Sequence, residues 1–259
     1  MLDLSLPRLK RRSVSVWRRN ILVWRKLMGP SLMLNFGEPL VYLLGLGYGL
    51  GLFIGKMAGV DYLTFLASGI IASSAMTTAT FEGMYSVYTR MVPQRTYDAM
   101  LATPTEVDDI LAGEMFWCAT KSLINGIAIL AVAAILGAVA DMRAVLVLPV
   151  VFLIGLCFAG PAMVMTSISK GYDFFAYYFT LVITPMFIVC GVFYPTNVLP
   201  EFVQRFVQVL PLTHAVALTR PLIIGQPLTD VALHISVLLA YAVIGYYIAV
   251  ILTRRRLVV

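Results

Sequence analysis

The chain has 259 residues, 60% of them hydrophobic and 12% charged, and its formal net charge at pH 7 is +6. Soluble globular domains carry about 25% charged residues, so a water-soluble domain does not fit this composition. The apolar runs lack the alternation of a transmembrane β-barrel, and the basic residues lie beside those runs, unlike a nucleic-acid-binding surface. We therefore predict an all-α membrane protein that binds no nucleic acid.

Residues 1–29 are expected to form an interfacial amphipathic helix. An apolar stripe recurs there at three- and four-residue steps, which is the period of a helix with one apolar face. Arginines flank the stripe, and tryptophan and arginine are typical of the headgroup level of a membrane. The stripe consists of Val14, Trp17, Ile21, Trp24 and Met28.

Six apolar runs are each long enough to cross about 30 Å of hydrocarbon at about 1.5 Å per residue. The basic residues of the N-terminal segment, of the region 90–95, of Lys170 and of the C-terminal tail fall on one side of this threading. The positive-inside rule puts that side, with both termini, in the cytoplasm. The predicted spans are 30–54, 62–84, 110–138, 145–167, 172–193 and 230–252.

Glycines are concentrated in the first run. Small residues four apart let helix backbones approach closely in lipid. Two interpretations stay open: packing against a helix of the same chain, and contact with a second copy of the chain. The glycines are Gly45, Gly47, Gly49, Gly51 and Gly55.

Charged residues inside the apolar runs are costly unless they face a partner or water. Glu38, early in the first run, is either an interfacial group or part of the cytoplasmic mouth of a transport pathway. Glu82, Glu114 and Lys121 raise the same question. Because Glu114 and Lys121 are seven residues apart and share one helix face, we expect Lys121 to pair with Glu114 or with Glu38.

A polar insert, RTYDAMLATPTEVDD at 95–109, separates the second and third runs. Its second half is expected to start the third span, with Thr105 as N-cap and Asp108 as the capping-box partner. Its first half is expected to form a short cytoplasmic helix within 91–104. That helix would offer a mixed basic, aromatic and aliphatic surface for docking into a groove of another protein. The docking residues are Arg95, Tyr97, Asp98, Met100 and Leu101.

Aromatic residues open the fifth run, in DFFAYYFTLV. Such residues at a membrane boundary form an interfacial belt, or they partly face a pathway in which sugar rings stack on them. Both interpretations stay open. The candidate pathway residues are Glu38, Tyr42, Phe175, Tyr177 and Tyr178.

Prolines cut the segment 194–229, between the fifth and sixth runs, into short pieces. Pieces too short to cross a membrane are tolerated at membrane depth when they pack in protein or line a cavity. We expect re-entrant helices that form an outer lid, with Phe202, Phe206 and His214 among its residues. His214 has no Cys, Asp or Glu cluster around it in the sequence, which favours a structural role.

Catalytic and metal-binding patterns are missing from the sequence. It contains no GxxxxGK[ST] phosphate loop, GxSxG, HExxH or CxxC. The three cysteines, Cys118, Cys157 and Cys190, lie inside apolar runs and are interpreted as packing residues. We therefore expect no catalytic residue, no metal site and no cofactor in this chain.

Seven segments together resemble the type-2 ABC exporter permeases, most closely the branch that exports nodulation factors, which are lipo-oligosaccharides. They extend over nearly the whole chain. The segments are WRRN (17–20), GEPLVYLLGLGYGLG (37–51), TTATFEGMYSVYTRM (77–91), RTYDAMLATP (95–104), GEMFWCATK (113–121), GYDFFAYYFTLVITPMF (171–187) and LPLTHAVALTRPLIIGQP (210–227).

This resemblance implies one permease domain over 1–259 in a bacterial inner membrane, exporting a lipo-oligosaccharide or another glycolipid or polysaccharide. It implies that the helix within 91–104 is a coupling helix, seated in a separate ABC ATPase that binds ATP–Mg. It also implies two permeases and two ATPases per transporter, surrounded by membrane lipid. A drug or lipid efflux permease is the alternative within the family, and a membrane-embedded enzyme or scaffold is the alternative outside it.

Overall fold

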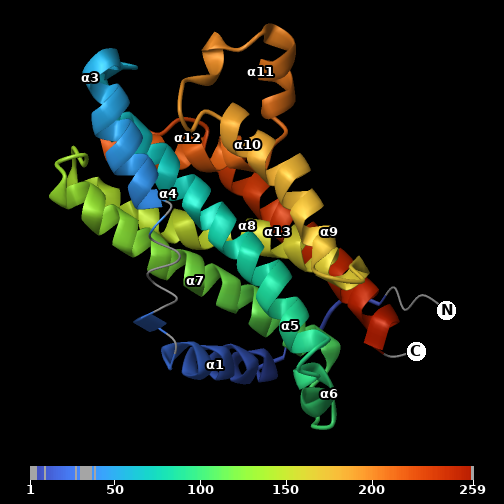
Figure 1. The fold of residues 1–259 in the computed structure, drawn as a ribbon. Coiled ribbons are helices and arrows are strands. Elements are labelled where there is room, and N and C mark those ends of the chain that lie inside the picture. Colours follow the sequence, from blue (N-terminus) through green and yellow to red (C-terminus); the bar gives the residue numbers. More distant parts are fainter. Residues whose placement is uncertain (1–4, 9, 27, 30–36, 38, 258–259) are drawn as a thin grey trace.

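The computed structural model describes residues 5–8, 10–26, 28–29, 37 and 39–257, and these are largely helical (Figure 1). The predicted interfacial helix appears as α1, which is shorter than 1–29. A two-residue antiparallel pair, with Lys56 opposite Asp61, turns the chain after the first apolar run. The elements up to that turn are α1 (Arg12–Arg25), η1 (Tyr42–Leu50), α3 (Gly51–Ile54), β1 (Lys56–Met57) and β2 (Val60–Asp61).

The middle of the chain holds the second and third predicted spans and the polar insert between them. The elements are α4 (Tyr62–Phe81), η2 (Glu82–Ser86), α5 (Val87–Met91), α6 (Thr96–Leu101) and α7 (Val107–Ile135). The last part of the chain begins with a 3-10 turn, η3 (Met142–Leu146). It continues with α8 (Val147–Ile168), α9 (Asp173–Tyr178), η4 (Phe179–Ile183), α10 (Thr184–Val189), η5 (Thr196–Val198), α11 (Glu201–Val207), α12 (Pro211–Ile224) and α13 (Val231–Leu257).

Four helical stretches of the described chain are long and apolar enough to cross a membrane: Tyr62–Met91, Val107–Ile135, Met142–Ile168 and Val231–Leu257. They coincide with the predicted second, third, fourth and sixth spans. The pair α11 and α12, bent by 87°, makes a fifth if it is one broken span. The apolar helices within the predicted first and fifth spans, Pro39–Ile54 and Asp173–Val189, are shorter. Six spans are therefore not established by length and composition.

The core of the single chain lies around α4 and α8. In the most apolar 18-residue window of Tyr62–Met91, 83% is buried inside the chain. In the corresponding window of Val231–Leu257, 28% is buried. The helix α8 packs against α13, α7 and α4. A Cβ added to Gly160 of α8 would lie 3.0 Å from the Cα of Gly245 of α13, so these two glycines let the two helix backbones approach each other closely. The outer face of α13 is left open to lipid or to another chain.

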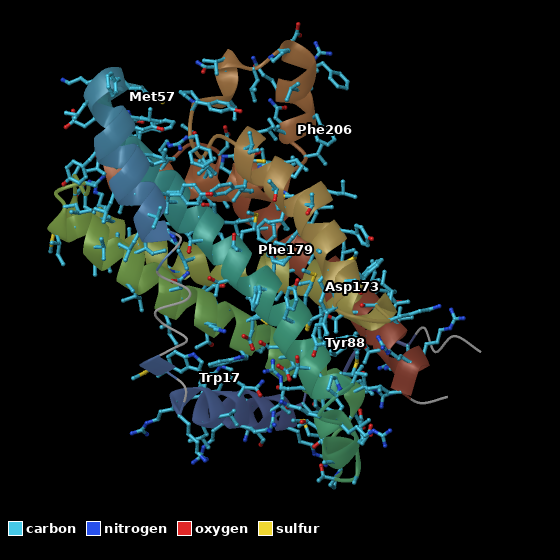
Figure 2. The ribbon with its side chains drawn as sticks, viewed as in Figure 1. Trp17, Met57, Tyr88, Asp173, Phe179 and Phe206 are labelled. Atoms are coloured by element: carbon cyan, nitrogen blue, oxygen red, sulfur yellow. The ribbon has the colours of Figure 1, made fainter. Side chains whose placement is uncertain are left out.

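The helices α1 and α6 and the C-terminal end of α13 lie at one end of the molecule, and α3 and α11 lie at the other (Figure 1). In Figure 2, Met57 and Phe206 mark the second end and Trp17 marks the first. The long apolar helices therefore connect two distinct ends of the described chain.

Two local boundaries differ from the sequence prediction. The N-cap of α7 is Glu106 instead of Thr105, and the backbone amide of Glu106 donates to Asp109 instead of Asp108. The reason is that the carboxylate of Asp108 accepts from Arg254 and from the backbone amide of Arg8. The helix expected within 91–104 is confined to α6, because α5 runs to Met91 and Arg95 takes a left-handed conformation with φ of 47°.

Candidate functional site

Four charged side chains meet between α4–α5 and α7, and we call Glu82, Arg90, Glu114 and Lys121 the buried ion cluster. Glu114 is 0% exposed. Its carboxylate accepts from Nε of Arg90 at 2.9 Å, from Nη2 of Arg90 at 2.7 Å and from Nδ2 of Asn20 at 2.8 Å. The two bonds from one guanidinium form the bidentate geometry that gives the strongest ionic hydrogen bonds, and Asn20 joins α1 to this pair.

Glu82 is the second carboxylate of the cluster and accepts four hydrogen bonds. Oε1 accepts from Nη2 of Arg90 at 3.1 Å and from the Trp117 indole at 2.8 Å. Oε2 accepts from Nζ of Lys121 at 2.7 Å and from the Ser86 hydroxyl at 2.9 Å. Both buried carboxylates are thus fully paired, which compensates for the cost of removing them from water.

The predicted pairing of Lys121 with Glu114 was wrong. Lys121 pairs with Glu82, and Glu114 is occupied by Arg90. Residues seven apart in one helix share a face but are separated by about 10 Å along the axis, so a direct Glu114–Lys121 bond is out of reach. The partner had to come from a neighbouring helix. Glu38, the other predicted partner, lies outside the described residues.

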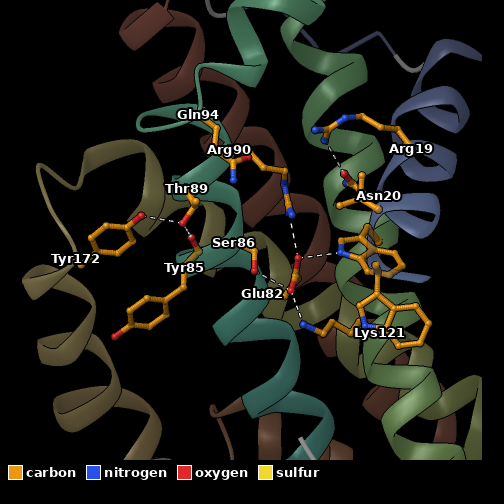
Figure 3. Close-up of a pocket in the computed structure, with 13 residues that line it drawn as sticks. Arg19, Asn20, Glu82, Tyr85, Ser86, Thr89, Arg90, Gln94, Lys121 and Tyr172 are labelled. Atoms are coloured by element: carbon orange, nitrogen blue, oxygen red, sulfur yellow. Dashed lines mark hydrogen bonds and ion pairs between the residues drawn. The ribbon is translucent and has the colours of Figure 1, made fainter. Parts of the chain in front are cut away.

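A cavity of about 350 Å³ opens beside the buried ion cluster (Figure 3). Residues of α1, of the continuous helix from α4 to α5, of α7 and of the loops before α6 and before α9 surround it. Its walls combine basic, hydroxyl and aromatic groups, with one carboxylate, that of Glu82. The lining residues are Arg19, Asn20, Val23, Trp24, Glu82, Tyr85, Ser86, Thr89, Arg90, Gln94, Trp117, Lys121 and Tyr172.

The helix α6 exposes only part of the predicted docking surface. Arg95 and Asp98 are exposed, and Met100 and Leu101 are half-buried against the core. Tyr97 is fully buried, so its ring is not available to another protein. Burial raises the pKa of Tyr97 well above its usual value, which keeps the phenol neutral. Tyr97 therefore anchors α6 from inside, because its six-residue helix has little other burial.

The acidic residues at the start of α7 do more than cap a helix. Nε and Nη2 of Arg254, in α13, donate to Asp108 at 2.9 and 2.5 Å, and the backbone amide of Arg8 donates to Asp108 at 2.9 Å. The backbone amide of Lys10 donates to Asp109 at 3.2 Å. These bonds join the N-terminal segment, the start of α7 and the end of α13.

The four predicted pathway residues that the structure describes do not gather at one place. Phe175 is fully buried and packs edge-on against Tyr85 and Tyr88, at 5.1 and 5.4 Å between ring centroids, so it is a packing residue within this chain. Tyr177 is 65% exposed and Tyr178 is half-buried. Tyr42 lies elsewhere, 5.6 Å from the ring of Phe187. Glu38 is outside the described residues.

The predicted outer lid divides into an exposed part and a buried part. Phe202 and Phe206 of α11 are 83% and 57% exposed. His214 of α12 is buried, with Nε2 2.8 Å from the carbonyl oxygen of Gln208 and Nδ1 2.8 Å from Nδ1 of His234 in α13. His214 thus has a structural bonding pattern, and its partner His234 was not foreseen, because the two histidines are separated by most of the segment between α12 and α13.

Sequence reasoning also missed Arg90, Asn20 and Arg254 as partners of buried carboxylates. Arg90 carried a signal, since it is a basic residue that continues the helix of Glu82 past the apolar run. Asn20 and Arg254 carried none, because their contacts join segments about a hundred or more residues apart.

The described residues contain no group of three or more His, Cys, Asp or Glu side chains able to hold a metal ion. All three cysteines are free and buried, which confirms their interpretation as packing residues.

Known proteins resemble this chain over almost its whole length. The family described as ABC-2 type transporter matches residues 10–224. Nodulation protein J of Rhizobium meliloti (strain 1021) is 44% identical over 94% of this chain and 93% of its own length. Nodulation protein J of Rhizobium leguminosarum bv. viciae is 46% identical over 94% of each chain. The inner membrane transport permease YadH of Escherichia coli (strain K12) is 24% identical over 93% of this chain and 94% of its own.

Proposed function

The chain belongs to the ABC-2 type transporter family, and from this premise we propose that it is the permease subunit of an ATP-driven exporter of lipo-oligosaccharides. The observation that carries the substrate class is the identity of 44% and 46% to two proteins named Nodulation protein J, over 94% of this chain. Identity of this level over this length supports the same architecture for this chain. The substrate would be an amphiphile with a sugar head and an acyl chain.

The proposed threading has six spans and both termini in the cytoplasm of a bacterial inner membrane. The helices Pro39–Ile54 and Asp173–Val189 would be the first and fifth spans, and α11 with α12 would re-enter the outer leaflet. Basic residues support this orientation, because α1 and the Arg254–Arg256 end of α13 lie at one end of the molecule (Figure 1). By the positive-inside rule that end faces the cytoplasm.

The proposed partner is a separate ABC ATPase, which binds ATP–Mg and hydrolyses it. The helix α6 would be the coupling helix and would offer Arg95 and Asp98, with the outer parts of Met100 and Leu101, to a cleft of the ATPase. Tyr97 is buried inside the permease, and α6 contacts α5 and α7. A movement of α6 would therefore be transmitted through Tyr97 to these two helices. Two permeases and two ATPases would form the transporter, since six helices alone leave no room for an amphiphile with a sugar head.

The test is reconstitution of the chain with its co-purifying ATPase in liposomes. A fluorescent acylated oligosaccharide should cross the bilayer only with ATP and only when both subunits are present. The same oligosaccharide without its acyl chain is the control for substrate class. ATPase activity that is indifferent to both compounds, with no ATP-driven movement of either, would contradict the proposal.

A further inference from the structure

The cavity beside the buried ion cluster has an excess of positive charge. Three cations, Arg19, Arg90 and Lys121, line it, and two carboxylates, Glu82 and Glu114, are bonded to Arg90 and Lys121. The remaining cation is Arg19. Its Nη1 donates a hydrogen bond to Oδ1 of Asn20 at 3.1 Å, and Arg19 makes no ion pair within the described part of the chain.

Arg19 is held at this place by the fold of α1. The side chain is half-buried, and burial lowers its pKa from the ordinary value. Its neighbour Asn20 is fixed by the bond to Glu114, so the backbone around Arg19 is anchored to α7. The carboxylate of Glu114 attracts Arg19, but burial opposes the charge more strongly than this attraction favours it. A bound anion would offset the remaining electrostatic cost.

The other walls of the cavity suit a polar ligand with a planar or ring-shaped body. The rings of Tyr85 and Tyr172 stack with an interplanar angle of 11° and centroids 6.1 Å apart. The hydroxyls of Thr89 and Tyr172 lie 2.8 Å from each other, and Gln94 adds an amide (Figure 3). A volume of about 350 Å³ is at the small end of the range of ligand sites.

The position of the cavity determines which molecules reach it. Val23 and Trp24 of α1 line it, while Val14 and Leu22 on the same helix are more than half exposed, as expected for a helix that lies in a membrane interface. The cavity is therefore at the level of lipid headgroups. This step rests on the proposed function, which places α1 on the cytoplasmic side.

We propose that this cavity binds the singly anionic headgroup of an amphiphile from the cytoplasmic leaflet, with Arg19 as the residue that holds the negative charge. Two sources carry this chemistry: an anionic membrane phospholipid and an acylated oligosaccharide that bears one acidic substituent. Either ligand contacts α1, α5 and α7 together, and through Arg90 it is joined to the two buried carboxylates. Occupancy of the cavity would thus stabilise the arrangement of helices around α6.

The tryptophans report directly on binding. Trp24 and Trp117 line the cavity, and Trp17 is the remaining one of the three tryptophans in the chain. The purified permease–ATPase complex in a neutral detergent is titrated with short-chain phosphatidylglycerol and with phosphatidylcholine of the same acyl length. We expect a saturable change in tryptophan fluorescence with the anionic lipid. The affinity for the zwitterionic lipid should be at least ten-fold weaker.

Matched variants locate the charge that matters. Arg19→Gln should weaken phosphatidylglycerol binding by ten-fold or more, and Arg19→Lys should retain most of it. Arg18→Gln removes the same charge from the exposed neighbouring position, outside the cavity lining, and should change the affinity less than two-fold. Equal binding of both lipids by the wild-type complex, or an equal loss in the Arg18 and Arg19 variants, would overturn the proposal. The lipid comparison needs no variant, so it decides the matter even if Arg19→Gln fails to fold.

Competition distinguishes the two sources of the headgroup. If the exported amphiphile is the ligand, an acylated oligosaccharide with one sulfate ester displaces phosphatidylglycerol and its unsulfated form does not. If the membrane lipid is the ligand, neither displaces it. ATP-driven movement of the unsulfated compound is measured in the same preparation. If the compounds are exported but the cavity binds anionic and neutral headgroups equally, this inference alone is contradicted. If neither compound is exported, the proposed function is contradicted.

Discussion

Glu82 and Glu114 share the guanidinium of Arg90, and among the described residues Glu82 also forms an ion pair with Lys121. The cluster is therefore balanced as two negative and two positive charges. Loss of either carboxylate leaves a buried positive charge without compensation. Because the side chains of Arg90 and Lys121 are each only 14% exposed, water compensates for such a charge only in part.

Glu114→Gln tests this balance. We expect the substitution to lower the free energy of unfolding by about 3 kcal/mol or more, since breaking a buried ion pair leaves one partner uncompensated. Unfolding of the detergent-solubilised chain by denaturant measures it. Glu201→Gln, which removes an ion pair whose two side chains are 78% exposed, is the control and should leave stability unchanged. Equal stability of the two variants would show that the cluster is not a stabilising unit.

Tyr97 allows a second test, because its hydroxyl is buried and has no hydrogen-bond partner among the described residues. An unsatisfied buried hydroxyl costs about 1–3 kcal/mol, so Tyr97→Phe should stabilise the chain or leave it unchanged. Tyr97→Ala should destabilise it by about 3–5 kcal/mol through the cavity it leaves, and α6 should lose its anchor. Thermal melting compares the stability of the two variants with that of the wild type. Substrate-stimulated ATPase activity tests whether α6 has lost its anchor in the Ala variant. A Phe variant less stable than the wild type would mean that the hydroxyl does have a partner.

The pairing of Glu82 with Arg90 shows why side-chain partners were not predictable here. In a regular α-helix, residues eight apart are rotated by about 80° from each other. The segment Glu82–Ser86 is π-helical, and the extra residue in such a turn brings the two side chains close to one face. No sequence pattern in this stretch announces the π turn, so the ion pair stayed hidden while the helix itself was predicted.

At the scale of elements, α12 and α13 are joined by the His214–His234 bond. The Gln208 carbonyl can only accept, so Nε2 of His214 carries a proton. When both rings are neutral, Nδ1 of His214 must then accept from Nδ1 of His234. One added proton on the pair is compatible with this bond, but a second proton removes the last lone pair between the rings. The contact is therefore present at neutral pH and lost in acid.

Hydrogen exchange tests this pH dependence. The amides of α12 should be protected at pH 7 and should exchange faster at an acidic pH at which both imidazole rings are fully protonated. His234→Phe removes the shared proton site, so protection of α12 in this variant should not depend on pH beyond the intrinsic exchange rate. The same pH dependence in the variant as in the wild type would refute a role for the histidine pair.

Elements differed in how far the sequence predicted them. Continuous apolar runs gave the four long helices, because a run of this length forms internally bonded helix wherever it is buried or in lipid. The first and fifth runs contain π-helical segments, η1 and η4, and yield shorter described helices. Boundaries set by long-range contacts, such as the start of α7, were beyond local rules, because Arg8 and Arg254 decide which acidic residue caps the helix.

At the scale of the whole molecule, the glycines of the first run resolve into two faces. A Cβ added to Gly47 would lie 2.5 Å from Cδ1 of Leu63, so that face packs against α4 inside the chain. A Cβ at Gly45 or Gly49 would meet nothing within 4 Å. Leu52 and Phe53, in α3 directly after this helix, are each 87% exposed. The face of Gly47 thus packs within the chain, and the face of Gly45 and Gly49 is free for contact with a second copy.

The open face is where a second copy of the chain would pack in the proposed transporter. Small residues permit close backbone contact between helices in lipid, so Gly45→Leu with Gly49→Leu should separate two copies while each chain stays folded. Gly47→Leu, at the inner face, should instead destabilise the single chain by about 1–3 kcal/mol through overpacking. Photobleaching steps of labelled chains in nanodiscs give the number of copies, and thermal melting gives the stability of each. Two copies retained in the Gly45 and Gly49 double variant would place the contact elsewhere, on a face such as the exposed side of α13, and ATP-driven export should then also survive the substitution.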